Sequence, residues 1–292
     1  MSEGPEVKIV ADKIQQALGK KSIEGIIINN LEENIKDKII GSSLDYANTY
    51  GKNLILRFSS GIYLRSHMLM WGKWRIYNRV EYEAGLAKLP PRRQNLKNSN
   101  IQDNSPKDVR SDSRTRLTII TSDKVLVEFN GPILQFSTEN PVFAEPIKSL
   151  GPDALAETFN AIEVKKRLKN KEKNNNLLLV DALLDQRIVS GIGNKYKSEI
   201  LFSTKLYPFK KISELSKNEI FNLVEKIPMI LNFGYKNKGR TRVISSDENN
   251  SWNNRHWVFR RSGKNCFICG TKIQSEKIYS KRITFWCPNC QK

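Results

Sequence analysis

The sequence is poor in the residues from which many active sites are built. It contains only two histidines in 292 residues, His67 and His256, and each is isolated along the chain. A lone histidine is more often a hydrogen-bonded structural residue than a catalytic one. The chain also carries no Walker phosphate loop, no plausible Ser-His-Asp set and no histidine-rich metal site. These absences exclude triad hydrolysis, P-loop chemistry and histidine-based metal catalysis.

Long apolar runs are also absent. No apolar stretch approaches the roughly 20 residues that a membrane span needs, so we expect no membrane partner. No signal peptide precedes the chain, which favours a reducing compartment. We therefore expect a protein that is not secreted and that lies in the cytoplasm or nucleoid of a prokaryote, or in the nucleus of a eukaryote.

Cysteine is missing from the first 265 residues. All four cysteines lie in the last 27, as Cys266-x-x-Cys269, 17 further residues and Cys287-x-x-Cys290. Each short turn can point two thiolates at one metal, so the spacing predicts a structural Cys₄ zinc hairpin with one zinc per chain. Two disulfides or four unconnected thiols are the alternatives, and a reducing compartment disfavours disulfides. Because no ligand position is left open, the chemistry must come from elsewhere.

Acidic residues are scarce relative to basic ones. The 49 Lys and Arg against 30 Asp and Glu give a net charge of +19. An excess of this size favours a polyanionic partner, and the predicted zinc hairpin makes nucleic acid the first choice. Simple solubility or the lysine-rich composition of an AT-biased genome is the alternative. The length suggests two domains, at roughly 100–200 residues for each.

The N-terminal half predicts one helix followed by many short strands. Residues 5–18 place Val7, Val10, Ile14 and Leu18 on one apolar stripe. Strands are expected over residues 23–28, 54–58, 62–66, 73–77, 117–121, 125–129 and 133–136, a pattern typical of a β-sandwich or barrel. The aperiodic, polar stretch 89–113 predicts a mobile loop inserted between two strands.

From about Gly151 the pattern becomes helical. Helices are expected over residues 161–170, 177–186, 195–203 and 217–232. The turn Gly191-Ile192-Gly193 precedes the third of these, and Asn194 is placed to cap it. Exposed backbone N–H groups at such a helix start would hold a phosphate, although most Gly-x-Gly turns are only structural.

The best candidate for a catalytic group is the N-terminus. Ser2 is small, so removal of Met1 would leave a free α-amine with a pKa of about 7.7–8.0, against about 10.4 for lysine. Far more of such an amine is an unprotonated nucleophile at neutral pH, and the carboxyl of Glu3 can act as general acid or base. This pair suits Schiff-base chemistry at a sugar C1′. An ordinary capping segment is the alternative.

A series of short motifs runs along nearly the whole chain. They lie at residues 2–6, 51–52, 66–75, 151–153, 184–186, 191–194, 199–201 and 282–291. Together they resemble the endonuclease VIII and formamidopyrimidine-DNA glycosylase family of base-excision repair enzymes. The Ser66-His67 pair and the run Phe285-Trp286-Cys287-Pro288 are closer to the endonuclease VIII branch.

The resemblance implies an α+β fold built as a two-domain clamp. Residues 1–150 would form an N-terminal helix plus β-sandwich domain, and residues 151–255 a helix-two-turn-helix DNA-binding domain. Residues 256–292 would form the zinc finger. Damaged DNA would lie kinked in the basic cleft, with the damaged base flipped out. We expect the protein to act as a monomer.

The resemblance also assigns roles to individual residues. The amine of Ser2 would attack C1′, and the resulting Schiff base would promote β- and then δ-elimination. Glu3 would donate a proton to the opening sugar, and Lys52 would contact a phosphate at the lesion. The predicted function is a DNA glycosylase and abasic-site lyase that removes oxidised bases, with pyrimidines favoured.

Further residues would bind the DNA. The resemblance places Asn194 and Arg282 on the phosphates that flank the flipped nucleotide. Leu69, Met70 and Trp71 would fill the void left by the base, as apolar side chains can wedge into a base stack. Burial at a strand end is the alternative for one of these three.

Two departures from the family pattern limit the prediction. The family usually has proline where this chain has Ser2, and the imine of a primary amine must be protonated before it can act as an electron sink. We therefore expect weaker strand cleavage. The segment 129–132 lacks an acidic residue that endonuclease VIII relatives often carry, which leaves the lesion preference open. The alternatives are a monofunctional or single-strand-preferring glycosylase, and a non-catalytic, zinc-containing protein that binds damaged DNA.

Overall fold

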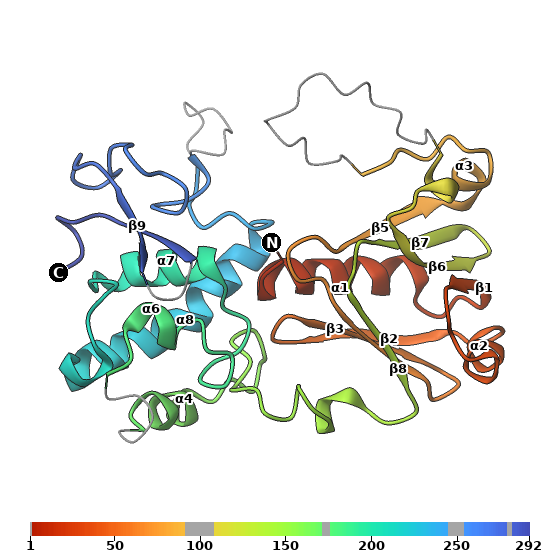
Figure 1. The fold of residues 1–292 in the computed structure, drawn as a ribbon, viewed down its shortest axis with the longest axis horizontal. Coiled ribbons are helices and arrows are strands. Elements are labelled where there is room, and N and C mark those ends of the chain that lie inside the picture. Colours follow the sequence, from red (N-terminus) through yellow and green to blue (C-terminus); the bar gives the residue numbers. More distant parts are fainter. Residues whose placement is uncertain (1, 91–107, 171–175, 245–253, 279–281) are drawn as a thin grey trace. The chain divides into compact units, whose positions relative to one another are not determined.

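The computed structural model describes residues 2–90, 108–170, 176–244, 254–278 and 282–292. The chain forms two compact units (Figure 1). The first, which we call the sandwich unit, comprises Met1–Ser2, Val10–Asn48 and Asn53–Pro141. The second, the helical unit, comprises Glu3–Ile9, Thr49–Lys52 and Val142–Lys292. Two short N-terminal segments therefore belong to the helical unit, while the expected domain boundaries after residues 150 and 255 stay a prediction.

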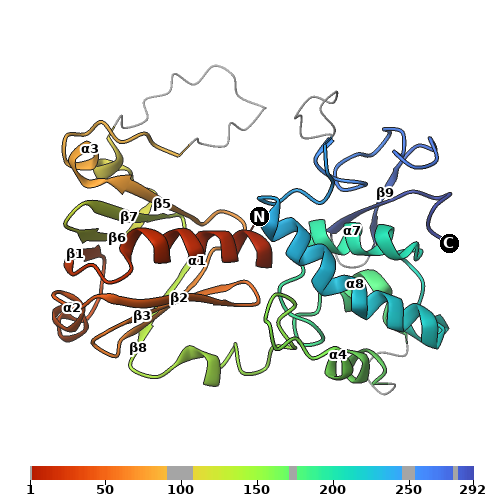
Figure 2. The same cartoon turned by 180° about the vertical axis from the view of Figure 1, so that it is seen from behind.

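The sandwich unit contains two four-stranded sheets, which confirms the predicted architecture. The first sheet has the order β1 (Ile23–Ile28), β6 (Thr115–Thr121), β7 (Lys124–Phe129), β5 (Lys73–Asn78). The second has the order β2 (Leu44–Tyr50), β3 (Asn53–Phe58), β4 (Tyr63–His67), β8 (Ile133–Ser137). Helix α1 (Gly4–Leu18) runs between the sheets in both views (Figures 1 and 2). Val7, Ile14 and Leu18 of the predicted apolar stripe are buried, whereas Val10 is half-buried.

Three elements of this unit were not expected from the sequence. They are α2 (Glu33–Ile39), β2, and α3 (Arg79–Glu83). Strand β2 contains Asp45 and Asn48, which are poor strand formers, so its pairing with β3 overrides local propensity. Helix α3 starts where the Asn78 side chain accepts bonds from two backbone N–H groups. The polar residues around Asn78 gave no sign of this cap in the sequence.

The predicted mobile loop 89–113 lies largely outside the described residues, since these omit 91–107. Its C-terminal end belongs to ordered structure. The short helix η1 (Val109–Ser111) buries Val109, and the buried carboxylate of Asp112 accepts bonds from the Arg114 guanidinium. The loop prediction was therefore too long at this end, because an ion pair and one apolar anchor fix residues that look polar and irregular in the sequence.

The helical unit is built around four helices of the described residues: α4 (Ala161–Leu168), α6 (Leu179–Ala182), α7 (Asn194–Thr204) and α8 (Lys217–Lys236). Two short 3₁₀ turns, η2 (Pro141–Phe143) and η3 (Ile212–Glu214), complete the helical elements. The predicted helix over 177–186 shrinks to the single turn α6. Helix α8 starts at a capping box between Ser216 and Glu219. The core between α4, α7 and α8 buries Val164, Ile200 and Val224.

The C-terminal hairpin pairs β9 (Gln274–Ile278) with β10 (Arg282–Trp286) in antiparallel register. A second small core joins it to α7, with Phe202, Val258 and Phe285 buried. The fold therefore agrees with the predicted α+β class: a helix plus sandwich, a helical region and a terminal cysteine hairpin. Within the described part of the chain, no helix has the length and apolar character that a membrane span requires.

Candidate functional site

The carboxylate of Glu3 caps helix α7 from a segment 190 residues earlier in the chain. Its Oε2 accepts bonds from the backbone N–H groups of Gly193 at 3.0 Å and Tyr196 at 3.1 Å. Its Oε1 accepts from the Lys195 N–H at 2.8 Å. These are the donors that a helix start leaves without a partner inside the helix. The expectation that they would be open for a phosphate is wrong, because Glu3 already occupies them.

Asn194 does not cap α7 as expected. The helix begins at Asn194 itself, and the residue at the cap position is Gly193, which has no side chain to cap the helix. A Cβ added to Gly193 would lie 2.4 Å from the Glu3 carboxyl carbon, so only glycine permits this approach. With the N–H groups taken by Glu3, the Asn194 amide turns to the hairpin and donates to the Ile283 carbonyl at 2.9 Å.

A buried lysine that the sequence did not single out completes this junction. Lys197, in the first turn of α7, is fully buried. Its ammonium donates to Asn194 Oδ1 and to Thr284 Oγ1, both at 2.8 Å. Burial lowers the pKa of Lys197 to about 8, against the opposing effects of Asp181 and Glu3. The spacing of three residues from Asn194 was the available signal, since such neighbours share a helix face.

Lys52 is presented by a tight turn. Gly51 has φ +61°, and a Cβ there would lie 3.0 Å from the Ser190 side chain. The Gly51 N–H donates to the buried Asp153 carboxylate at 2.9 Å, which fixes the turn. Burial lowers the pKa of Lys52, while Glu3 raises it.

Arg282 acts electrostatically on both lysines of this region. Its charge opposes protonation of Lys52 and of Lys197 and so lowers the pKa of each. Four residues predicted for the site therefore come together in the helical unit: Glu3, Lys52, Asn194 and Arg282.

A second, half-buried carboxylate fixes the peptide that follows Ser2. The Glu3 N–H donates to Glu6 Oε2 at 3.2 Å. Glu6 also accepts bonds from the Lys195 ammonium and, at 3.3 Å, from the Tyr196 hydroxyl. Burial raises the pKa of Glu6, and Lys195 opposes that rise. This cluster was not predicted from the sequence, because its members lie far apart in the chain, on α1 and α7.

Ser2 and the apolar loop belong to the sandwich unit. The Ser2 hydroxyl donates to the Met68 sulfur at 3.7 Å. Met68 is buried, whereas Leu69, Met70 and Trp71 expose 47%, 46% and 53% of their surface. The alternative that one of the three is buried at a strand end is therefore wrong, because the preceding Met68 supplies the anchor. Three neighbouring exposed apolar side chains are a costly arrangement that indicates a binding surface.

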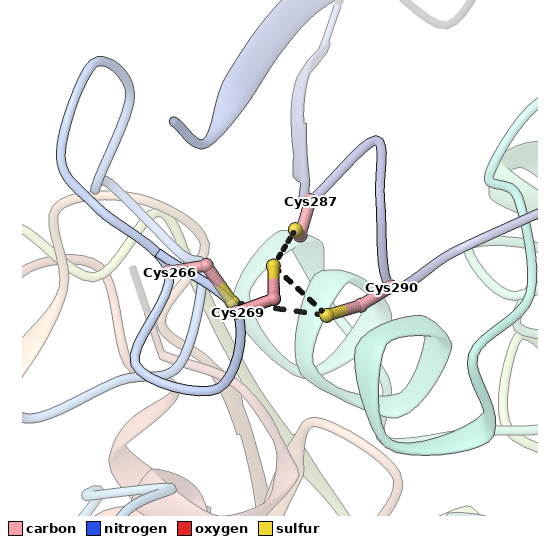
Figure 3. Close-up of side chains that lie close together, drawn as sticks. All are labelled: Cys266, Cys269, Cys287 and Cys290. Carbon is pink, nitrogen blue, oxygen red and sulfur yellow. Dashed lines mark hydrogen bonds between the residues drawn. The ribbon is translucent and has the colours of Figure 1, made fainter. Parts of the chain in front are cut away.

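The four cysteines form one cluster (Figure 3). Their sulfurs all lie within 4.8 Å of one another. Cys269 lies 3.4 Å from both Cys287 and Cys290, and Cys266 lies 3.9 Å from Cys290. A tetrahedral ion with metal–sulfur bonds of about 2.3 Å separates its sulfurs by about 3.8 Å. The cysteines are free, so the disulfide alternative is wrong and the cluster fits a metal site.

Glu199 anchors the segment that enters this cluster. Its buried carboxylate accepts bonds from the N–H groups of Trp257, Val258 and Phe259, each at 2.9 Å. It also accepts the Thr241 hydroxyl at 2.5 Å. One side chain of α7 therefore holds the start of the cysteine region through three backbone donors and also binds Thr241, which follows α8.

One buried acidic residue lies immediately before the segment 129–132. Glu128 is fully buried, and its Oε2 accepts the Gly131 N–H at 2.8 Å. Burial raises its pKa to about 7. The segment itself has no acidic residue, as expected, but a carboxylate does support its turn from within the sandwich unit.

Comparison with known proteins agrees with this arrangement. The family model described as formamidopyrimidine-DNA glycosylase N-terminal domain matches residues 1–132, and the model of the H2TH domain of the same glycosylase matches residues 150–245. An endonuclease 8 from Klebsiella pneumoniae is 28% identical over 293 residues and covers 100% of both chains. A formamidopyrimidine-DNA glycosylase from Prochlorococcus marinus is 39% identical over 155 residues, which span 52% of this chain and 53% of that protein.

Solved structures share the fold. A complex of the Lactococcus lactis Fpg with DNA containing an abasic site has a TM-score of 0.75 at 24% identity and covers 100% of both chains. Fold and sequence together define the class of a DNA glycosylase and abasic-site lyase. The chain belongs to the formamidopyrimidine-DNA glycosylase and endonuclease VIII family, which confirms the resemblance found in the sequence.

Proposed function

We propose that this protein removes oxidised bases from DNA, with pyrimidines favoured, and then cleaves the strand through a Schiff base formed by the Ser2 α-amine. The observation that carries the proposal is the placement of Glu3. Its carboxylate is fixed by three backbone donors, and Lys52 acts on it electrostatically. The relatives matched over the full length of both chains are named endonuclease 8, in agreement with the endonuclease VIII resemblance from which the preference for pyrimidines is taken.

In the proposed reaction, the unprotonated amine attacks C1′ and the glycosidic bond breaks, with the electron pair leaving on the base. Glu3 supplies a proton to the ring oxygen O4′, the C1′–O4′ bond breaks, and the oxygen stays on C4′ as a hydroxyl, which leaves an imine at C1′. The protonated imine then acts as an electron sink for loss of the 3′ and afterwards the 5′ phosphate. Because the amine of Ser2 is primary, the imine must be protonated first, so the elimination steps are slow.

DNA binding completes the proposal. Lys52, Asn194 and Arg282 contact phosphates around the lesion, and the exposed loop residues 69–71 enter the base stack where the damaged nucleotide leaves it. The partner is damaged DNA, and the protein acts as a monomer. A cytoplasmic or nucleoid location follows from this partner and from the bacterial relatives.

Zinc is the proposed metal of the cysteine cluster. Four thiolates at tetrahedral spacing are the donor set that Zn²⁺ prefers in structural sites, and all four positions of the ion would be filled by protein. The ion would therefore stabilise the hairpin that carries Arg282 and take no part in the reaction.

Borohydride trapping tests the proposed nucleophile. The native protein should form a covalent complex with duplex DNA that contains an abasic site or an oxidised pyrimidine. Proteolysis should place the adduct on the N-terminal peptide. One extra residue ahead of Ser2 should abolish trapping, whereas Ser2→Pro should retain it and increase δ-elimination, since a secondary amine gives a permanently cationic iminium.

The other outcomes decide between the alternatives. An adduct on Lys52 would assign the nucleophile to that lysine. Base release without any trapping would make the protein a monofunctional glycosylase, and higher turnover on single strands would support the single-strand alternative. Binding of damaged DNA with neither base release nor trapping would identify a non-catalytic binding protein.

A further inference from the structure

The buried ammonium of Lys197 lies between Asn194, which is proposed to grip the DNA backbone, and Thr284, which is two residues from Arg282. It connects α7 to β10 because one bond goes to Asn194 on the helix and the other to Thr284 on the strand. Thr284 is itself buried and follows Arg282 by two residues, so the two side chains point to the same face of β10. The position of Arg282 therefore depends on how this strand is held against α7.

The ammonium also fixes the orientation of the Asn194 amide. An ammonium only donates, so the atom that faces Lys197 must be the amide oxygen. The amide nitrogen then points to β10, where it donates to the Ile283 carbonyl between Arg282 and Thr284. An amide nitrogen carries two hydrogens, and this bond uses one of them. The second is available for a phosphate oxygen only while the amide keeps this orientation.

We propose that Lys197 is a positioning residue for DNA binding, which sets Asn194 and Arg282 in register as one phosphate cradle without touching the DNA. The proposal rests on the proposed function, because it assigns phosphates to those two residues. A buried lysine carries a desolvation cost that an apolar residue would avoid. At this position the cost is offset by two hydrogen bonds that join separate segments of the chain.

Salt dependence separates this role from that of a direct phosphate contact. The probe is a labelled duplex with a tetrahydrofuran abasic analogue, bound by the full-length, zinc-loaded protein and compared with an undamaged duplex. Lys197→Met should weaken binding of the analogue about tenfold and leave the slope against log salt unchanged, because a buried ammonium displaces no counterion. Arg282→Ala should weaken binding and reduce the slope by about 1.

A gentler pair of variants guards against misfolding. Thr284→Val removes the hydroxyl that Lys197 holds and keeps the shape of the side chain, whereas Thr284→Ser keeps the hydroxyl. The valine variant should lose affinity for the analogue with an unchanged salt slope, and the serine variant should bind like the native protein. Lys217→Met, which removes an exposed lysine at the start of α8, is the charge control.

The effect of pH gives an independent readout. The charged groups that act on Lys197 are Asp181, Glu3 and Arg282, from α6, the N-terminal segment and β10. Burial lowers the pKa of Lys197 to about 8, so the protein should lose affinity for the analogue as the pH rises through 8. In Lys197→Met, the part of this pH-dependent loss of affinity that comes from deprotonation of Lys197 should be absent.

Three outcomes are distinguishable. A reduced salt slope in Lys197→Met would overturn the positioning role in favour of direct phosphate contact. Unchanged affinity in Lys197→Met and Thr284→Val, with Arg282→Ala still weakened, would overturn the proposal and spare the proposed function. If the affinity of Arg282→Ala were unchanged, Asn194 and Arg282 would not form a phosphate cradle, and their proposed role in DNA binding would be wrong.

Discussion

The helical unit and the sandwich unit bury carboxylates under different conditions. Glu3 and Glu199 in the helical unit each accept three backbone N–H bonds. Glu128 in the sandwich unit accepts the Gly131 N–H through one oxygen, and its Oε1 has no partner among the described residues. An unpartnered buried oxygen favours the neutral acid, which agrees with the raised pKa of Glu128.

The difference shows what each carboxylate does for the chain. Glu3 ties the N-terminal segment to α7, and Glu199 ties α7 to residues 257–259, so both join segments far apart in sequence. Glu128 supports its own turn, three residues away, and interacts with the backbone of Lys73 on the neighbouring strand β5. A buried charge costs free energy unless its donors are complete. Both Glu3 and Glu199 have such sets of donors, and both lie in the helical unit that carries Lys52, Asn194 and Arg282 of the proposed site.

Of the changes to the helical unit, removal of the metal should have the largest effect. Cys287→Ser should abolish zinc binding and binding of damaged duplex, because the cysteine directly follows β10 and metal binding supplies much of the folding free energy of such a hairpin. The unfolding transition of the sandwich unit should remain. Metal analysis, fluorescence anisotropy and circular dichroism measure the three quantities, with Ser262→Ala as the control. If the zinc-free variant still bound damaged DNA, the proposed DNA-binding residues would not depend on the folded cysteine hairpin.

Glu199→Ala should have the next largest effect. It leaves three backbone N–H groups, two of them buried, without their acceptor and removes one of the two partners of the Thr241 hydroxyl, so the free energy of unfolding should fall by about 3–5 kcal/mol. Urea denaturation of the full-length protein measures the loss. The exposed Glu225 on α8 supplies the control, and Glu225→Ala should change stability by less than about 0.5 kcal/mol. A loss below 1 kcal/mol would mean that water replaces the carboxylate at these donors.

The features that sequence could predict are those with local signals. Alternating strands, the apolar stripe of the first helix and the paired C-x-x-C turns each depend on nearby residues, and all three are present in the structure. Glu3, Lys52, Asn194 and Arg282 were assigned to one site through the family motifs. That they lie together in the helical unit could be seen only in the structure, because residues 3–9 and 49–52 belong to this unit although their sequence neighbours belong to the sandwich unit.

The residues that sequence missed are charged side chains whose partners lie far away. Lys197 looks like a solvated lysine on a helix until Thr284 is brought beside it. Asn194 has the right type and place for a cap, yet Glu3 takes that role from a distance of 190 residues. Local propensity describes one helix alone, and a cap supplied by another segment lies outside what it can describe.

The last prediction concerns Glu128 and has the smallest effect. Its folded pKa of about 7 exceeds the ordinary glutamate pKa of 4.5, which applies to the unfolded chain, so between these values the folded state binds more protons than the unfolded state. Stability from this group is therefore fully present below pH 4.5 and is lost as the pH rises through 7. The loss should not exceed about 3.4 kcal/mol, at 1.36 kcal/mol for each pKa unit.

Glu128→Gln removes the ionisation and keeps an oxygen for the Gly131 N–H. The variant should be more stable than the native protein by about 1 kcal/mol at pH 8, since its amide nitrogen still lacks an acceptor. At pH 5 the advantage should vanish or reverse. Urea denaturation at pH 5, 6, 7 and 8 measures the difference in the free energy of unfolding between the two proteins. Contributions from other titrating groups such as His256 are the same in both and cancel in this difference. Exposed Glu139→Gln is the control, and parallel curves for Glu128→Gln and the native protein would show that the buried carboxylate does not titrate in this range.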